Sequence, residues 1–299
     1  SVLDVCKHLE KSGCEVSYLH VDKFGRINFD ELVNAIRPTT ILVSIMFANN
    51  EIGTLQPIEE IGKICNERGI LFHTDATQAI GKIPIDVAKM NINLLSLSAH
   101  KIYGPKGIGA LYVRKKNPRV TISAQQHGGG HEKGIRSGTL NVPAIVGLGK
   151  AIEISTNKIG NETQRISSLR NLLQEKLFSE IENIWLNGHP TERIPNNLNI
   201  GFDGIDAEAL MMGMKEIAVS SGSACSTSQA MPSHVLKAIG LTNEQAHSCI
   251  RFGIGRFNTQ DEIEYTAKRV AEVVNQLRSI SPKYKIKKQK EEVYKLTEV

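Results

Sequence analysis

The sequence lacks the features that mark several large classes of protein. None of its apolar runs approaches the roughly 20 residues that a membrane-spanning helix needs, and no signal peptide is recognisable at its start. Its five cysteines are irregularly spaced and include no C-x-x-C pair, which argues against a structural zinc site and for a reducing, cytosol-like compartment. Aromatic residues are only 5% of the chain and do not alternate with basic ones, so nothing indicates direct nucleic-acid recognition.

The net positive charge is concentrated in the C-terminal tail. The whole chain carries +5, and residues 281–299, with six lysines and three glutamates, contribute +3 of it. We expect this Lys-rich tail to be a solvated helix or a disordered segment, with contact to an acidic partner as the alternative.

Strand-like and helix-like patterns alternate along the chain. Its 299 residues exceed one ordinary domain, so we expect a large α/β domain at residues 1–150, a linking helix and smaller α+β domain at 151–280, and the tail at 281–299. The alternation predicts a mostly parallel sheet with helices on both faces. Expected strands are residues 40–47, 70–74, 94–98, 110–113, 198–202, 218–221 and 248–254. Expected helices are residues 29–36, 58–68, 138–158, 162–182, 207–214 and 261–277.

The most informative segment is Ser98-Ala99-His100-Lys101-Ile102-Tyr103-Gly104, which follows the apolar run at residues 92–97. A lysine directly after a buried strand, flanked by Ser and His and followed by glycines, is poorly explained by solvation. A lysine that forms a Schiff base needs a partly desolvated site, polar neighbours that handle protons, and small residues that admit a flat cofactor. The segment favours a pyridoxal phosphate (PLP) lysine at Lys101, with a solvated turn lysine as the alternative. We expect Lys106 to be an ordinary surface residue.

A second candidate is Asp75, which follows an apolar strand and precedes small polar residues that could open a helix. Ligands of open α/β sheets collect at the carboxyl ends of strands. A carboxylate there can pair with the protonated pyridine nitrogen of PLP. The alternative is that Asp75 only caps the following helix.

A third candidate is Cys225, within the Ser/Gly-rich run Ser220-Ser221-Gly222-Ser223-Ala224-Cys225. In so polar a segment a thiolate is accessible and can move, so we expect a reactive role and an exposed or poorly ordered loop with Gly222 as hinge. The alternative is a buried structural cysteine. We expect the other four cysteines to be buried small hydrophobes: Cys6, Cys14, Cys65 and Cys249.

A fourth candidate is the strand near residues 247–257, which carries Arg251 and Arg256. An arginine on a rigid strand presents a planar fork that suits a substrate carboxylate. A structural ion pair is the alternative for either arginine.

Taken together, these segments make the chain resemble the cysteine desulfurases of the IscS/NifS group, in the class-V aminotransferase superfamily. The resemblance runs in order from near residue 1 to about residue 282. Its motifs are Asn49-Asn50-Glu51-Ile52-Gly53, His73-Thr74-Asp75-Ala76-Thr77-Gln78, residues 98–107, Gly128-Gly129-Gly130-His131-Glu132, Arg136-Ser137-Gly138-Thr139, residues 220–225 and residues 250–257. It implies the α/β, PLP-dependent aminotransferase-like fold (fold type I).

The resemblance also implies a role for each matching residue. Lys101 would hold PLP covalently, with His100 beside the ring as a proton-handling partner. Asp75 would pair with the pyridine nitrogen, and Asn50 and Gln78 would lie near the ring oxygen. The remaining cofactor contacts would come from Ser98, Ala99, His100 and, across a homodimer, Thr139.

For catalysis, the resemblance implies that Arg251, assisted by Asn50, clamps the carboxylate of L-cysteine. Cys225 would take the sulfur as a persulfide, leaving L-alanine, and could touch a nascent iron–sulfur cluster transiently through that persulfide. An iron–sulfur scaffold protein and other sulfur acceptors, including those for tRNA thiolation, would be the partners. The expected location is cytoplasmic, or mitochondrial in a eukaryote, without membrane or direct nucleic-acid contact.

The chain departs from the family at its N-terminal side. Members of the family carry about 100 further residues there, which supply a phosphate-binding turn and a ring-stacking histidine. The alternatives to a desulfurase are a selenocysteine lyase, another class-V PLP lyase, or a truncated fragment without catalysis.

Overall fold

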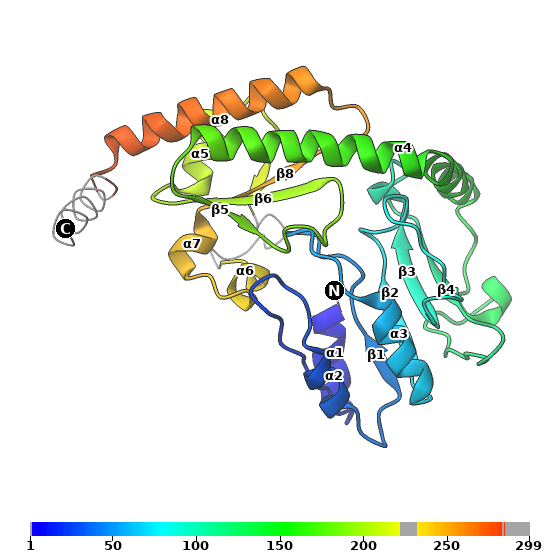
Figure 1. Cartoon of the computed structure of the whole chain (residues 1–299). Coiled ribbons are helices and arrows are strands. Elements are labelled where there is room, and N and C mark those ends of the chain that lie inside the picture. Colours follow the sequence, from blue (N-terminus) through cyan, green and yellow to red (C-terminus); the bar gives the residue numbers. More distant parts are fainter. Residues whose placement is uncertain (1, 222–231, 283, 285–299) are drawn as a thin grey trace.

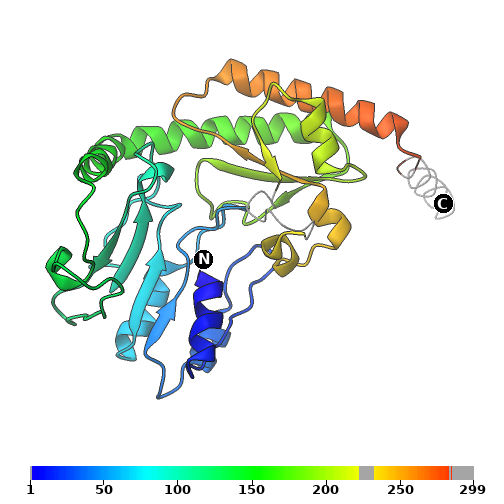
Figure 2. The ribbon, with the colours of Figure 1, turned by 180° about the vertical axis from the view of Figure 1, so that it is seen from behind.

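A computed structural model describes residues 2–221, 232–282 and 284 of the chain. The segment around Cys225, which was predicted to be mobile, and most of the Lys-rich tail lie outside the described residues. Two four-stranded sheets lie side by side in this structure, and one long helix extends from the first sheet across the second (Figures 1 and 2).

The first sheet has the order β1-β2-β3-β4, formed by β1 (Leu42–Ser44), β2 (Leu71–Asp75), β3 (Leu94–Ser98) and β4 (Gly109–Val113). β1, β2 and β3 are parallel, whereas β4 is antiparallel to β3. α1 (Val2–Lys11) and α2 (Phe29–Ala35) lie near this sheet, and α3 (Ile58–Glu67) packs Ile58, Ile61 and Cys65 into its core. The predicted, mostly parallel α/β architecture is confirmed here, although the first strand is shorter than expected.

The second sheet has the order β5-β6-β8-β7 and is antiparallel throughout. Its strands are β5 (Ile184–Asn187), β6 (Asn197–Phe202), β7 (Ser220–Ser221) and β8 (Cys249–Gly253). Every residue of β6 is buried, because both of its faces are covered. The helices of this part are α5 (Ala207–Gly213), α6 (His234–Ala238), α7 (Asn243–His247) and α8 (Gln260–Ile280). β5, α6 and α7 were not predicted.

α4 (Val142–Glu180) is one helix of 39 residues, so the prediction of two separate helices is wrong. It is bent, because its first part is seen nearly end-on while the rest runs across the view (Figure 1). A glycine such as Gly160 costs a helix only about 1 kcal/mol, which packing can offset. Contacts just beyond it hold the helix to both sheets: Thr163 Oγ1 donates to the carbonyl of Lys82, and Arg165 donates to the carbonyl of Asn258.

Two further predictions need correction. Cys65 and Cys249 are buried as expected, but Cys14 is exposed and Cys6 is only partly buried, because α1 buries none of its residues. Residues 76–82 form turns, so no helix follows Asp75.

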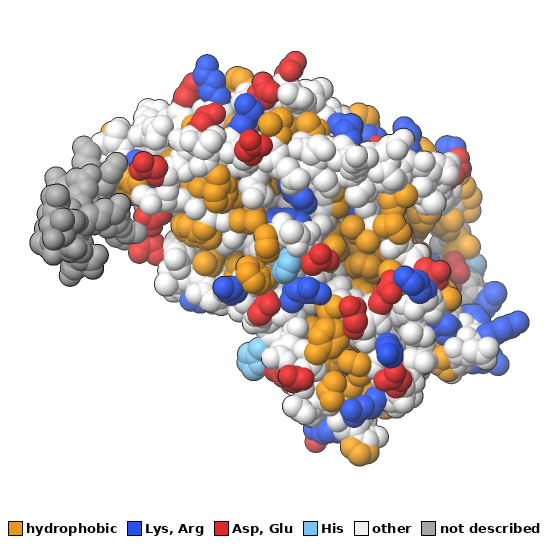
Figure 3. Space-filling view, in the orientation of Figure 1, with side chains coloured by type: hydrophobic (Ala, Val, Ile, Leu, Met, Phe, Trp, Pro, Cys, Tyr) orange, Lys and Arg blue, Asp and Glu red, His pale blue; other side chains and the backbone are white. Residues whose placement is uncertain are grey.

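The described surface carries charges of both signs. Acidic and basic side chains are interspersed over the face in Figure 3, with hydrophobic side chains between them. Lys106 is exposed, as predicted. No helix among the described residues is long and apolar enough to cross a membrane.

Candidate active site

The carboxyl ends of β2 and β3 bring two of the predicted segments to one edge of the first sheet. The strands are parallel neighbours, with Asp75 in register with Ser96, so Asp75 and Ser98 end at the same edge. The chain after β1 reaches this edge as well, because the N–H of Phe47 donates to the carbonyl of Asp75 at 2.9 Å. Ligands of open α/β sheets bind at such edges.

One carboxylate oxygen of Asp75 accepts a hydrogen bond from a described residue, and the other accepts none. Oδ1 accepts the N–H of Thr77 at 2.9 Å, which is the local bond that a capping aspartate makes. Among the described residues Oδ2 has no hydrogen-bond partner, and Asp75 itself is half-buried. The carboxylate therefore supports a turn and still offers an acceptor.

His73, two residues before Asp75, is the centre of a row of hydrogen-bonded polar side chains that runs across the sheet. Its ring forms hydrogen bonds with Ser44 Oγ at 2.8 Å and Ser96 Oγ at 2.9 Å, joining β1, β2 and β3. Burial lowers the pKa of His73, and the charge of Asp75 opposes this shift. His73 is therefore a neutral neighbour of Asp75 around pH 7, which the sequence did not indicate.

Lys101 ends a short 3-10 turn, Ala99–Lys101, that continues β3. Ala99 is fully buried against Leu148 and Ala151 of α4. Gly104 allows this close packing, since a Cβ there would lie 3.0 Å from Ala99 Cβ, which is tighter than nearly all real Cβ contacts. Ser98 Oγ and His100 Nδ1 form a hydrogen bond of 2.8 Å. The turn is thus packed against α4, while the side chain of Lys101 is exposed and makes no hydrogen bond with any described residue.

Arg251 approaches from the second sheet. Its Nε and Nη2 donate to Ser220 Oγ at 3.1 and 2.8 Å, and its Nη1 donates to the carbonyl of Asn50 at 2.9 Å. Each Nη keeps one N–H without a partner among the described residues, so two donors remain for a carboxylate. Asn50 and Arg251, predicted to share a substrate, are therefore brought together.

Arg256 has the structural role that was the alternative for both arginines. Its guanidinium forms a bidentate ion pair with Glu162 of α4 and lies 4.7 Å over the ring of Tyr103. The backbone N–H of Arg256 donates to the Tyr103 hydroxyl at 2.7 Å. Because both carboxylate oxygens of Glu162 hold this guanidinium, Arg256 is not available to a substrate.

Two predicted residues, Gln78 and Thr139, make no side-chain hydrogen bond with the other predicted residues in the described part of the chain. Gln78 is half-buried in the turn after Asp75, and only its carbonyl is bonded. Thr139 is exposed in the segment before α4. Cys225 lies outside the described residues.

Three neighbours of these residues were given no role from the sequence. Lys82 lines a small cavity with Lys101; a lysine between Ile80 and Ile83, four residues after Gln78, was the available signal. Ser220 is the partner of Arg251. Glu51 is buried, which raises the pKa of its carboxyl, and it accepts the hydroxyl of Ser233 at 2.6 Å.

The fold and this site define a class of enzyme. The sequence pattern of the class-V aminotransferases matches residues 1–266, and the chain belongs to this family. Two relatives, each named cysteine desulfurase IscS, come from Proteus mirabilis (strain HI4320) and Escherichia coli (strain K12 / DH10B). They are 50% and 51% identical over 289 residues, which cover 97% of this chain and 71% of each relative. A solved NifS-like protein superposes with a TM-score of 0.83, at 36% identity, over 92% of this chain and 72% of that one.

Membership of this family implies PLP as the cofactor, and the donor set fits it. A free carboxylate oxygen at Asp75, a hydroxyl and an imidazole at Ser98 and His100, and an unpaired amine at Lys101 lie at adjoining strand ends. These are the groups that a pyridine nitrogen, a phosphate and an aldehyde require.

Proposed function

We propose that the chain is a cysteine desulfurase, which removes sulfur from L-cysteine to give L-alanine and an enzyme-bound persulfide. The observation that carries the proposal is the hydrogen bond from Arg251 to the carbonyl of Asn50. Asn50 lies three residues after Phe47, which bonds the backbone of Asp75 at the edge of the first sheet. This arrangement supports a carboxylate clamp from one sheet facing the cofactor groups of the other. The two IscS relatives support cysteine as the substrate.

Each side chain has a separate task in this proposal. Bound PLP supplies an electron sink for the bonds of the substrate's α-carbon. Lys101 holds the cofactor, Asp75 keeps its ring nitrogen protonated, and His100 moves protons beside it. Ser98 and His100 bind the phosphate, with Ala99 providing close backbone approach, and Gln78 and Asn50 lie near the ring oxygen.

Substrate binding and sulfur collection use groups of the second half of the chain. Arg251 receives the carboxylate of cysteine on its two free N–H groups. The thiolate of Cys225 attacks the substrate sulfur, so an S–S bond forms, the C–S bond breaks, and the carbon receives a proton to become alanine. Cys225 then carries the persulfide and can present it transiently to a nascent iron–sulfur cluster.

We also propose the setting that the relatives suggest. The persulfide would pass to an iron–sulfur scaffold protein and other acceptors, including those for tRNA thiolation. The protein would work in the cytoplasm as a homodimer, with Thr139 reaching the phosphate of the partner subunit. The domain boundaries at residues 150 and 280 also stay proposals; α4 runs through the first.

The test is to trap the cofactor on its lysine. Borohydride reduction of the PLP-loaded protein should place the adduct on the peptide of residues 98–106, and Lys101→Ala should lose both the adduct and alanine production. Lys106→Ala is the matched control, because Lys106 is an exposed lysine of the same loop. An adduct on Lys106 would contradict the assignment, and faster turnover of selenocysteine than of cysteine would favour a selenocysteine lyase.

A further inference from the structure

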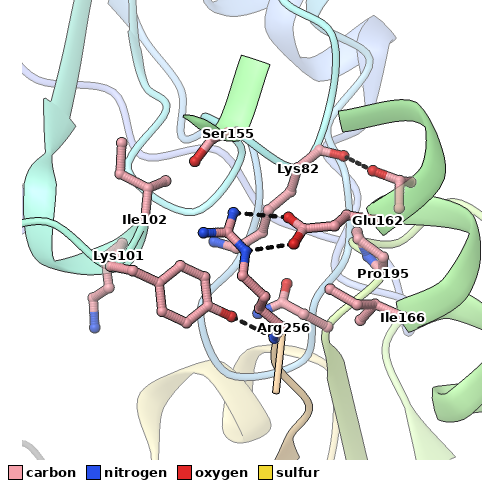
Figure 4. A pocket seen from close by; sticks show the side chains of 12 residues that line it. Lys82, Lys101, Ile102, Ser155, Glu162, Ile166, Pro195 and Arg256 are labelled. Carbon is pink, nitrogen blue, oxygen red and sulfur yellow. Dashed lines mark hydrogen bonds and ion pairs between the residues drawn. The ribbon is translucent and has the colours of Figure 1, made fainter. Parts of the chain in front are cut away.

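Lys82 is a lysine in an unusual place, close behind the proposed cofactor site. It lines a cavity of about 30 Å³, together with Lys101, Tyr103, Glu162 and Arg256. Figure 4 shows the Lys82 side chain entering this space beside the Arg256–Glu162 pair, while the amino group of Lys101 points away from that pair. None of the roles proposed above uses Lys82.

No acidic side chain in the described part of the chain pairs with Lys82. The carboxylate of Glu162, which lines the same cavity, is held by the guanidinium of Arg256. Burial, together with the smaller effect of the charge of Lys101, lowers the pKa of Lys82 to about 8. A buried amine without a counter-ion lowers the stability of the folded protein. We therefore expect its hydrogen bond to serve a purpose that offsets this loss.

Among the described residues, this amine donates one hydrogen bond, and it goes to the turn that follows Asp75. Lys82 Nζ donates to the carbonyl of Gln78 at 2.9 Å. The carbonyl of Lys82 itself accepts from Thr163 Oγ1 of α4 at 2.8 Å. Gly81, with φ +69°, lets the turn approach α4, since a Cβ there would lie 2.8 Å from Ser155 Cβ. Lys82 therefore ties the middle of the turn, at Gln78, to its end, whereas Thr163 bonds only the end at residue 82, away from Asp75 and Gln78.

We propose that Lys82 is a positioning residue for PLP, because it fixes the turn that carries Asp75 and Gln78. This inference rests on the proposed function, in which Asp75 meets the ring nitrogen and Gln78 lies near the ring oxygen. Lys82 itself does not touch the cofactor. It holds the backbone of Gln78 at the distance from Asp75 that the ring requires.

The experiment compares PLP binding by Lys82→Met, Lys82→Arg and Thr163→Val with the unchanged protein. Methionine keeps the length and removes the donor, arginine keeps donor and charge, and valine removes the adjoining hydrogen bond on α4. The readouts are the PLP dissociation constant and the absorbance band of lysine-bound PLP, measured well below each unfolding midpoint. We expect Lys82→Met to bind PLP about tenfold more weakly, with a shifted band. Lys82→Arg should recover most of the affinity, and Thr163→Val should lower only the unfolding midpoint.

Wild-type PLP affinity and spectrum in Lys82→Met would overturn the proposal. So would an equal loss of affinity in Thr163→Val, since that result would assign Lys82 a structural role only. Should Lys82→Met not fold, Lys82→Leu, which also removes the donor, replaces it in the comparison with Lys82→Arg, with the same expected loss of affinity. Absence of Lys101-dependent PLP binding in the unchanged protein would instead overturn the proposed function itself.

Discussion

At the scale of single residues, the environments of two arginines separate their roles. Arg251 shares its guanidinium between a serine hydroxyl and a backbone carbonyl, which leaves two N–H groups for a ligand. The guanidinium of Arg256 forms an ion pair with Glu162 and lies over the ring of Tyr103. The two residues are five positions apart, and only their surroundings distinguish them.

Arg251→Lys should weaken cysteine binding by about 1–3 kcal/mol, because it keeps the charge but loses the bidentate fork. PLP binding should barely change. The measurement is a cysteine titration of the PLP-loaded protein, in which the change of its absorbance spectrum reports the affinity for cysteine. Arg256→Lys is the control and should lower the unfolding midpoint without changing cysteine affinity. A larger loss of cysteine affinity in Arg256→Lys would show that the wrong arginine was chosen.

The buried cysteines differ from what a sulfur carrier requires. Burial raises the pKa of the Cys65 thiol to about 11 and that of the Cys249 thiol to about 12. Both thiols are therefore protonated near pH 7, and thiols attack as thiolates. Cys249 also donates to the carbonyl of Gln245 at 3.1 Å, which identifies it as a structural residue.

At the scale of elements, α4 connects the two sheets. Its first half packs Leu148 and Ala151 against the turn of Lys101, and its second half packs Leu169, Leu173 and Leu177 into the core of the second sheet. A single helix transmits the position of one end to the other more directly than two helices with a loop.

Gly160→Ala tests the continuity of α4. Gly160 is exposed and lies where two helices were expected to meet, and a Cβ added to it would have no neighbouring atom within 4 Å. In a continuous helix the substitution should raise the free energy of unfolding by about 0.5–1 kcal/mol. Gly149→Ala, equally open and exposed, is the matched control and should stabilise in either case. Stabilisation by Gly149→Ala alone would contradict the single helix.

At the scale of the whole molecule, the site lies between two hydrophobic cores. One core belongs to the first sheet and the other to the second. Polar contacts join them near residues 50–53: Asn199 donates to the carbonyl of Glu51, and Arg193 donates to the carbonyl of Ile52. The proposed clamp and the proposed cofactor site thus come from separately packed parts.

Cys225→Ala tests the movement of sulfur across the whole molecule. Given cysteine and no external thiol, the variant should still bind its substrate but form neither protein-bound persulfide nor alanine, because the soft nucleophile is missing. The measurement is persulfide and alanine yield. Cys14→Ala, which removes an exposed thiol, should retain both products. Persulfide at the normal yield in Cys225→Ala would move the role to another thiol.

Much of the fold could be predicted from local patterns. The segments before Asp75 and Lys101 became β2 and β3, because short runs rich in Ile, Leu and Phe that end in polar residues favour partly buried strands. The helix at residues 261–277 was expected, and in the structure Thr259 and Glu262 form its capping box. The residues at which the short strands β1 and β7 begin and end could not be predicted, because pairing with neighbouring strands rather than propensity sets these limits.

The sequence alone determined the family and the candidates at Asp75, Lys101, Arg251 and Cys225, because these residues follow strands or lie in polar loops at recognisable spacings. Only the tertiary structure decided that Arg251 meets Asn50 while Arg256 meets Glu162, and that Lys82 reaches the carbonyl of Gln78. Contacts between residues far apart in the chain depend on how the two sheets pack across α4. Local patterns contain no information about that packing.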